Sequence, residues 1–533
     1  MIDDNTATDY EIGQDNITPF GLDIHNPVFL ISGLSIIAFV LVTLMFQQGS
    51  AEFFSWLRPA ITSTFDWFFL AAGNIFVLFA LVVSISPLGK VRLGGQHARP
   101  DYSYVGWFSM LFAAGMGIGL MFFGVSEPMS HFGSSMGGIS IGENGIRTDW
   151  APLGAAAGDI GAAKELAMAA TIYHWGLHPW SMYAVVALAL AFFSFNHNLP
   201  LTLRSAFYPL LGEKVWGWSG HVIDTIAVFA TLFGLATSLG FGTQQALAGF
   251  SFLYDWGTGG VAVVLLITAI TLIAIVSVVR GLDGGVKVLS EINMCLAIGL
   301  MLFILFVGPT GDIFSTLFSG AIAYVREFIP LSMPFGREDA NFSQGWTSFY
   351  WAWWISWSPF VGMFIARVSR GRSVREFLFC VILVPTLLSV LWMATFGGTA
   401  LSQVIADASA PVGAVAQEIK LFHMLSDFPM SALLSLVGIV LVLVFFVTSS
   451  DSGSLVIDTI TAGGKTDAPV SQRVFWCSFE GLVAAVLLLV GGAEALGALQ
   501  AMAVSTGLPF TVVLLAMCVS LWIGLSRASK EID

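Results

Sequence analysis

The sequence predicts an all-α integral membrane protein with twelve transmembrane helices, and two observations lead to that fold class. Hydrophobic residues make up 56% of the 533 positions and charged residues only 10%, whereas soluble globular domains carry about 25% charged residues. Apolar runs of about 20 residues, long enough to cross a bilayer as a helix, recur along the chain. A mean hydropathy of +0.84 therefore indicates that lipid surrounds most of the folded protein.

The predicted spans follow one another with short polar connections, which leave no room for a soluble catalytic domain. Their limits are 27–47, 66–87, 103–126, 166–196, 222–254, 259–279, 289–308, 345–366, 376–398, 431–457, 473–491 and 507–526. The expected organisation is an acidic cytoplasmic N-terminal segment (1–26), two peripheral transmembrane helices (27–102), a first five-helix repeat (103–308), an amphipathic connecting segment (309–344), a second repeat (345–526) and a short cytoplasmic tail (527–533).

The distribution of Lys and Arg tests this arrangement independently, because cytoplasmic loops are enriched in both residues. With the N-terminus in the cytoplasm, only six of the 21 Lys and Arg residues fall outside: Arg58, Arg147, Lys164, Arg326, Arg337 and Lys420. We therefore expect both termini in the cytoplasm. The acidic N-terminus lacks the positive start of a cleavable signal peptide.

A weak internal repeat relates the third and eighth predicted spans. Residues 104–109 align with 351–356 through an aromatic residue, a Trp and a Ser, and a Gly-Met pair follows each Ser at the same spacing, at Gly115 and at Gly362. Each span would open a unit of five helices, so the second unit would be inverted in the membrane. Inverted repeats with a binding site at their interface are typical of secondary transporters.

Other functional classes find little support in the sequence. A net charge of −13 without a basic stripe argues against nucleic acid. His174 and His178 lie four residues apart, as in a zinc pair, but Pro179 bends the helix and no Glu lies between them. No carboxylate–histidine constellation or charged pore ring is apparent, so neither an enzyme nor a channel is expected, and no organic cofactor is implied.

Three alternate glycines occupy the middle of the third span, in the motif of residues 113–119. Each glycine costs a helix about 1 kcal/mol relative to alanine. One interpretation is close packing against a neighbouring helix. The other is a locally unwound helix whose free backbone groups face a ligand, and Gly115 and Met116 are counted among the expected substrate-binding residues. The two interpretations are compatible.

Two groups of aromatic residues lie in the fourth and eighth spans. At helical spacing, one stripe of the eighth span carries Phe349, Trp353, Trp357, Phe360 and Phe364, with Trp354 on its flank; the fourth span contributes Trp175, Trp180 and Tyr183. Tryptophan usually marks the membrane interface, but several of these lie near mid-span. Aromatic faces can hold a methylated ammonium, which donates no hydrogen bond. The centres of the spans also lack the Asp, Glu or Lys that would pair with an amine.

Hydroxyl residues form a third group, Thr448 and Ser449 in the tenth span and Thr231, Thr237 and Ser238 in the fifth. Hydroxyls in membrane helices commonly bond back to their own helix carbonyls. Together with the glycines of the third span, they could instead complete an oxygen cage for Na⁺.

The segments 113–128, 174–183 and above all 349–375 resemble the betaine/choline/carnitine transporter family, and the likeness extends over about residues 26–525. It is closest to sodium-coupled glycine betaine symporters. The resemblance implies two inverted five-helix repeats after two extra helices, a homotrimer, and the bacterial inner membrane. It implies a substrate box of Trp175, Trp180, Tyr183 and Trp354, with Trp353, Trp357 and Phe349 moving with or gating the ligand.

The resemblance also bears on ion coupling. Proton-coupled choline importers carry an acid where this chain has Gly119, which favours sodium and betaine-like zwitterions. One family sodium site corresponds to carbonyls of Ala113, Met116 and Phe445 and hydroxyls of Thr448 and Ser449. A second family sodium site corresponds to Thr231 and Phe360, but Leu235 stands where the second hydroxyl of that site belongs. The second site would therefore be incomplete unless Thr237 or Ser238 supplies the hydroxyl.

Sodium-coupled symport of a zwitterionic quaternary ammonium or sulfonium solute, glycine betaine or dimethylsulfoniopropionate, is the favoured function. The alternative is a proton-coupled or exchange-driven carrier of choline or carnitine. The four arginines Arg367, Arg370, Arg372 and Arg375 are expected to anchor the topology and to contact anionic lipid. The short tail after Leu525 predicts no tail-based osmotic regulation.

Overall fold

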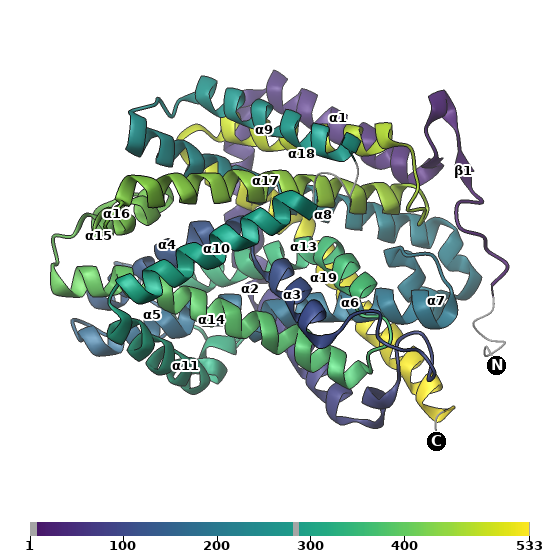
Figure 1. The fold of residues 1–533 in the computed structure, drawn as a ribbon, viewed down its shortest axis with the longest axis horizontal. Helices are drawn as coiled ribbons and strands as arrows, with labels where there is room; N and C mark the ends of the chain where they lie inside the picture. Colours follow the sequence, from purple (N-terminus) through teal and green to yellow (C-terminus); the bar gives the residue numbers. More distant parts are fainter. Residues whose placement is uncertain (1–7, 281–286, 532–533) are drawn as a thin grey trace.

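The computed structural model describes residues 8–280 and 287–531, and nearly all of them are helical (Figure 1). Near the N-terminus, β1 (Asn16–Ile17) and β2 (Ile24–His25) form an antiparallel pair with Asn16 opposite His25. This hairpin docks on the connection after α17, where the Lys465 ammonium lies 2.5 Å from an Asp23 carboxylate oxygen. The acidic N-terminal segment is thereby tied to the helical body.

The helices of the first half of the chain are α1 (Asn26–Met45), α2 (Gln47–Ile85), α3 (Tyr104–Gly115), α4 (Ile118–Gly137), α5 (Ile160–Trp175), α6 (Leu177–His197), α7 (Tyr208–Leu211), α8 (Trp218–Tyr254), α9 (Gly260–Arg280) and α10 (Lys287–Val307). Those of the second half are α11 (Thr310–Ser332), α12 (Ala340–Phe342), α13 (Ser348–Val368), α14 (Val374–Ala406), α15 (Pro411–Ala414), α16 (Lys420–Ser426), α17 (Ser431–Thr461), α18 (Val470–Gly491) and α19 (Ala495–Lys530). Short 3₁₀ turns join several of them, and a π-helical turn, η6 (Ser343–Thr347), leads into α13.

Within the described residues, ten helical segments are long and apolar enough to cross a membrane, and the bent pair α3–α4 makes an eleventh. The predicted eighth span is present as α13 but is not among them, because its Trp, Tyr, Ser and Pro residues lower its hydropathy. An all-helical membrane protein is therefore confirmed. The count of twelve spans and the inverted repeat stay predictions. The predicted amphipathic connection forms α11.

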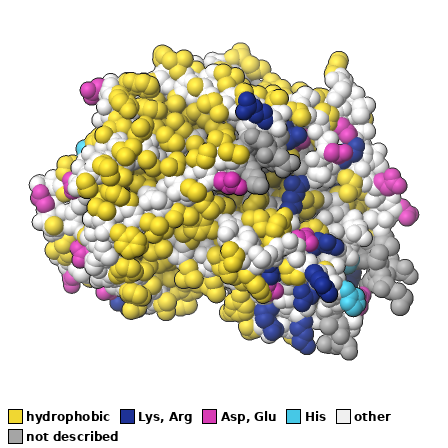
Figure 2. Space-filling view, viewed as in Figure 1, with side chains coloured by type: hydrophobic (Ala, Val, Ile, Leu, Met, Phe, Trp, Pro, Cys, Tyr) yellow, Lys and Arg dark blue, Asp and Glu magenta, His cyan; other side chains and the backbone are white. Residues whose placement is uncertain are grey.

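The surface of the protein suits a lipid environment. Hydrophobic side chains cover most of the face in Figure 2, whereas Lys and Arg gather towards one side. Large apolar side chains such as Val261, Phe306 and Val325 are 70% or more exposed. In water such a surface would aggregate, so these side chains mark the lipid-facing exterior.

Helix α13 lies near the middle of the molecule (Figure 1), packed against α6, α8 and α19. Trp351, Trp353 and Trp354 are consequently buried, the first two almost completely, whereas Trp357 is partly buried. The packing of α13 against α6 brings the two predicted aromatic groups together.

The four arginines predicted to contact lipid differ in their surroundings. Arg370 and Arg375 are exposed. Arg372 is buried; it forms an ion pair with Glu376 at 2.7 Å, and its guanidinium lies 4.6 Å from the ring centre of Trp107. Arg372 therefore serves the packing of α3 against α14 rather than a lipid head group.

Candidate functional site: an aromatic cavity at a broken helix

The glycine motif breaks its helix, as one of the two interpretations predicted. Helix α3 ends at Gly115, Met116 and Gly117 have extended backbones, and α4 starts at Ile118 with its axis turned by 63°. The first amides of α4 have no partner within the helix. The break therefore exposes backbone donors and carbonyl oxygens in the interior of the protein.

Glycine is needed here because indole rings approach the backbone closely. A Cβ atom at Gly119 would lie 2.7 Å from Trp175 Cη2 and 3.0 Å from Trp353 Cη2. A Cβ atom at Gly115 would lie 3.3 Å from Trp180 Cζ2. Real Cβ atoms do not approach other carbons as closely as the position at Gly119 would require. Close packing and unwinding therefore occur in the same motif.

The broken helix forms one wall of a cavity of 490 Å³, and aromatic rings form the others. Its lining residues are Ala114, Gly115, Met116, Gly117, Ile118, Gly119, Leu120, Trp175, Pro179, Trp180, Tyr183, Ser238, Trp353, Trp354, Trp357 and Ser389. Every residue predicted to bind substrate lines this cavity except Phe349. The Phe349 ring stacks on Trp353 at 5.5 Å between centres and lines a neighbouring cavity of 1110 Å³.

Hydrogen bonds and ring contacts fix the aromatic walls. The Trp354 indole donates to the His174 carbonyl at 2.9 Å and meets the Trp175 ring edge-on at 4.8 Å. Trp357 donates to the Gly234 carbonyl at 2.9 Å. The Tyr183 hydroxyl is buried and has no hydrogen-bond partner among the described residues. The cavity thus combines rigid π faces with an available hydroxyl and the first amides of α4.

The residues predicted for the first sodium site line a second cavity of 760 Å³, which shares Ala114, Met116 and Trp357 with the aromatic cavity. The predicted set found there is Ala113, Met116, Phe445, Thr448 and Ser449, together with Phe360. The Thr448 hydroxyl donates to the Val444 carbonyl at 3.0 Å, the local bond that is common in membrane helices.

The residues considered for a second ion are not brought together in the same way. Thr231 donates to the Ala227 carbonyl at 2.7 Å and lines neither cavity. Leu235 packs against Gly453, where an added Cβ would lie 2.3 Å from it. Thr237 bonds to the carbonyls of Phe233 and Leu499. Only Ser238 reaches the aromatic cavity, where it accepts from the Trp353 indole at 3.2 Å.

His174 and His178 do not face one another. The helix is interrupted at Gly176, between α5 and α6, and the two histidine rings bond to separate groups. His178 Nε2 lies 3.0 Å from the Asn74 side-chain oxygen, whereas His174 Nδ1 lies 2.6 Å from a carboxylate oxygen of Glu127.

Glu127 is the residue that the sequence analysis missed, and two expectations are wrong because of it. Glu127 in α4 is fully buried, as is Glu480 in α18, near the middle of the predicted span 473–491, so the membrane-spanning helices do contain interior carboxyl groups. Glu127 also forms a carboxylate–histidine cluster with His131 and His174, whose possible ligand atoms all lie within 4.8 Å of one another. The predicted third span ended at residue 126, which left Glu127 in a connection. The residues next to Glu127 and Trp175 in the sequence gave no indication that these two side chains would form a hydrogen bond.

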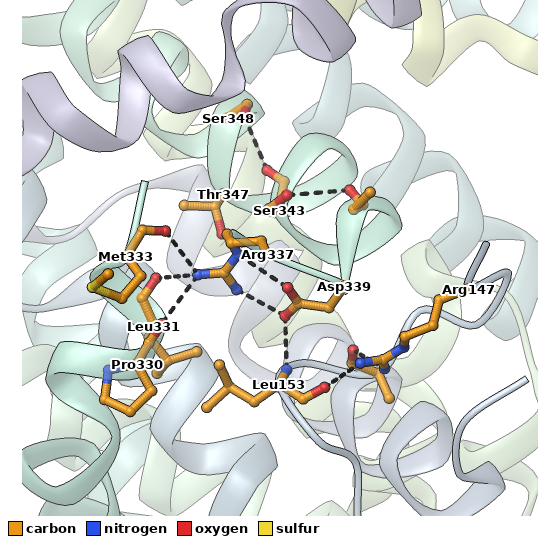
Figure 3. Close-up of polar contacts among 12 residues, drawn as sticks. Arg147, Leu153, Pro330, Leu331, Met333, Arg337, Asp339, Ser343, Thr347 and Ser348 are labelled. Carbon is orange, nitrogen blue, oxygen red and sulfur yellow. Dashed lines mark hydrogen bonds and ion pairs between the residues drawn. The ribbon is translucent and has the colours of Figure 1, made fainter. Parts of the chain in front are cut away.

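The segments leading to α5 and α13 are clamped together by an ion pair (Figure 3). Arg337 bonds to both carboxylate oxygens of Asp339, at 3.0 and 2.7 Å, and to the Leu331 carbonyl at 2.7 Å. The Asp339 carboxylate also accepts from the Leu153 backbone amide at 2.7 Å. The connection before α5 is thereby joined to the turn that opens α13.

A second ion pair lies within the connection before α5 itself. Arg147 bonds to both oxygens of Asp149, at 3.1 and 2.6 Å, and also donates to the Leu153 carbonyl. The hydrogen bonds from the Arg147 guanidinium lower the pKa of the Asp149 carboxyl from 3.8 to about 2. The carboxylate is thus ionised over the whole physiological range.

Known proteins resemble this chain over nearly its full length. The profile of the BCCT family, described as betaine/carnitine/choline family transporter, matches residues 27–530. The glycine betaine/proline/choline transporter of Vibrio parahaemolyticus is 63% identical over 522 residues, 97% of this chain and 94% of that protein. Glycine betaine transporter 1 of the same organism is 54% identical, covering 97% of both chains. The glycine betaine transporter of Acinetobacter baylyi is 40% identical, covering 92% of this chain and 72% of that one. The chain therefore belongs to the betaine/carnitine/choline transporter family and is a multi-pass membrane transporter, not an enzyme.

Proposed function

We propose that the protein imports a zwitterionic quaternary ammonium or sulfonium solute by Na⁺-coupled symport. The observation that carries the proposal is the aromatic cavity at the helix break. Its rings suit a methylated cationic head, because a desolvated ring over such a cation contributes about 2 kcal/mol or more. The first amides of α4 and the Tyr183 hydroxyl suit the carboxylate at the other end of the solute.

The relatives support this substrate class. Their names refer to transport of glycine betaine, proline and choline, and that of a further 54% identical relative adds ectoine. Glycine betaine is our first candidate, and dimethylsulfoniopropionate, whose sulfonium head is also cationic, is the second.

Sodium as the coupling ion is supported by the second cavity. The set Ala113, Met116, Phe445, Thr448 and Ser449 offers neutral carbonyl and hydroxyl oxygens on one cavity wall, which are suitable ligands for a hard monovalent cation. Thr448 would have to turn its hydroxyl from the Val444 carbonyl to the ion. We propose one Na⁺ at this site and none at Thr231 and Phe360, since Thr231 lies away from both cavities.

The competing function is proton-coupled or exchange-driven transport of choline or carnitine. It has less support, because this chain has Gly119 where the resemblance places an acid in proton-coupled choline importers. We further propose the bacterial inner membrane, cytoplasmic termini and a homotrimer.

The test is uptake into proteoliposomes of glycine betaine, dimethylsulfoniopropionate, choline, carnitine and ectoine, each with and without an inward sodium gradient. We expect betaine uptake that requires sodium. Undiminished betaine uptake after complete removal of sodium would refute the coupling, and transport of choline alone would refute the substrate class.

A further inference from the structure

A buried carboxylate stands directly behind one wall of the aromatic cavity. The two oxygens of Glu127 meet four side-chain donors from three helices. One oxygen lies 2.6 Å from His174 Nδ1 and 3.3 Å from His131 Nε2. The other accepts from Trp175 Nε1 at 2.7 Å and from the Tyr350 hydroxyl at 2.5 Å. Glu127 is therefore fully buried and fully hydrogen-bonded.

The hydrogen-bond network assigns a negative charge to this cluster. A carboxylate accepts about four hydrogen bonds only when it is ionised. His174 Nδ1 needs a proton to donate to Glu127, and Nε2, which lies 2.9 Å from the Thr347 hydroxyl, can accept from that hydroxyl when the ring is neutral. His131 Nδ1 is buried without a partner among the described residues, which suits an unprotonated nitrogen. With both imidazoles assigned to these neutral forms, the cluster carries the one negative charge of the Glu127 carboxylate.

The same network touches the rings that form the cavity. Trp175 lines the cavity with its ring while its N–H points to Glu127. Tyr350 lies nearly parallel to Trp354, with centres 6.0 Å apart, and the backbone carbonyl of His174 holds the Trp354 indole. None of the described residues that line the cavity is charged. Glu127 thus supplies the negative charge that the cavity wall itself lacks.

We propose that Glu127 is the fixed counter-charge of the aromatic cavity and makes it selective for cationic head groups over uncharged groups of the same shape. An indole that donates to a carboxylate gains electron density on its faces, which strengthens its attraction for a cation. The charge also acts directly, because it lies in a protein interior of low dielectric. The inference rests on the proposed function, since it assigns Glu127 a role towards the same solute.

The variant Glu127→Gln removes the charge and can retain the three shorter hydrogen bonds, those with His174, Trp175 and Tyr350. Its amide oxygen can accept from Trp175 and Tyr350. Its amide nitrogen can donate to His174 Nδ1 once that ring moves its proton to Nε2. His174 Nε2 would then donate to the Thr347 hydroxyl, at the same 2.9 Å. His131 keeps its proton on Nε2, because Nδ1 has no partner among the described residues, and its 3.3 Å bond to residue 127 is lost. Steric fit is therefore kept while one charge is lost.

The measurement compares glycine betaine with tert-butylacetate, its carbon isostere, which has the same shape and carboxylate but no positive charge. Affinities of both for the purified full-length protein in sodium buffer are obtained from tryptophan fluorescence. We expect Glu127→Gln to reduce the ratio of the two affinities about tenfold or more, through weaker betaine binding with little change for the isostere. Glu127→Asp, which keeps the charge but shortens the side chain, should weaken both ligands and retain most of the ratio.

Glu480→Gln is the matched control. Glu480 is also fully buried and accepts from Ser450 at 2.8 Å, but Ser450 does not line the aromatic cavity, whereas Trp175, which donates to Glu127, does. The ratio of the affinities for betaine and its isostere in Glu480→Gln should equal that of the wild type. A ratio that is unchanged in Glu127→Gln, with both affinities falling together, would show a purely structural role and overturn the inference. A ratio lost in Glu127→Asp would do the same. Failure of the wild type to bind betaine would instead overturn the proposed function.

Discussion

Adding a single methyl group to Gly119 tests whether the aromatic cavity is as rigid as its hydrogen bonds imply. In Gly119→Ala, the new Cβ would lie 2.7 Å from Trp175 and 3.0 Å from Trp353. Carbon atoms pack at about 3.5–4.0 Å, so the Trp175 ring would have to move by about 1 Å. Trp175 is held by its 2.7 Å bond to Glu127, and Trp353 by its bond to Ser238. Neither ring can withdraw without weakening a buried hydrogen bond.

The size of the effect follows from the cost of overpacking. Extra methyl groups in well-packed interiors cost about 1–3 kcal/mol. If the displaced rings are the ones that hold the solute, this cost reduces its affinity by about fivefold to 150-fold, at 1.4 kcal/mol per factor of ten. The affinity of the purified protein for glycine betaine, measured by titration calorimetry, gives this number directly.

Gly133→Ala is the matched control for that experiment. Gly133 lies in the same helix, α4, and a Cβ atom there would meet nothing within 4 Å. We expect wild-type affinity and a slightly higher melting temperature, because alanine favours a helix over glycine by about 1 kcal/mol. Wild-type betaine affinity in Gly119→Ala, with the protein correctly folded, would refute the assignment of these indoles to the solute.

Three further outcomes are expected. Trp354→Ala should abolish betaine uptake, measured in proteoliposomes, while the melting temperature of the inserted protein shows that it still folds. Thr448→Ala combined with Ser449→Ala should raise the sodium concentration for half-maximal uptake about tenfold or more, since it removes two ion ligands; unaltered sodium dependence would contradict the site. Asp149→Asn should lower the melting temperature at neutral pH. The wild-type advantage should persist above pH 3.8 and fade as the pH drops towards about 2, because the Asp149 pKa is lowered in the folded state. An advantage independent of pH would exclude the Arg147 ion pair as its source.

The sequence predicted those parts of the site that depend on local composition. The glycines at 115, 117 and 119 indicated a weak point in a helix, and α3 and α4 separate there. Helical spacing placed Trp353 and Trp354 on adjoining faces near mid-span, and burial of α13 at the centre turned both towards the cavity. In each case neighbouring residues in the chain carried the information.

Features that depend on packing between distant segments could not be predicted. Glu127 appears unremarkable in sequence, beyond the end of an apolar run, and its role emerges only when α5 and α13 bring Trp175 and Tyr350 to it. The position of the Thr231 side chain also depends on packing between distant segments. Its hydroxyl type and position fitted an ion site, but the rotation of α8 turns it away from both cavities.

The broken helix gives the proposed coupling a physical basis. Ala114 and Met116 line both the aromatic cavity and the cavity with the predicted sodium ligands. Binding of one ligand in either cavity would order this extended segment. The loss of conformational entropy would then already have occurred, and the second ligand would bind more tightly. Such coupling is reciprocal, so sodium must raise the affinity for solute by the same factor by which solute raises the affinity for sodium. Because Trp357 also borders both cavities, this indole and the segment form the wall that the two cavities share within the described part of the chain. Coupling between solute and ion must therefore depend on that wall more than on any residue that contacts one ligand alone.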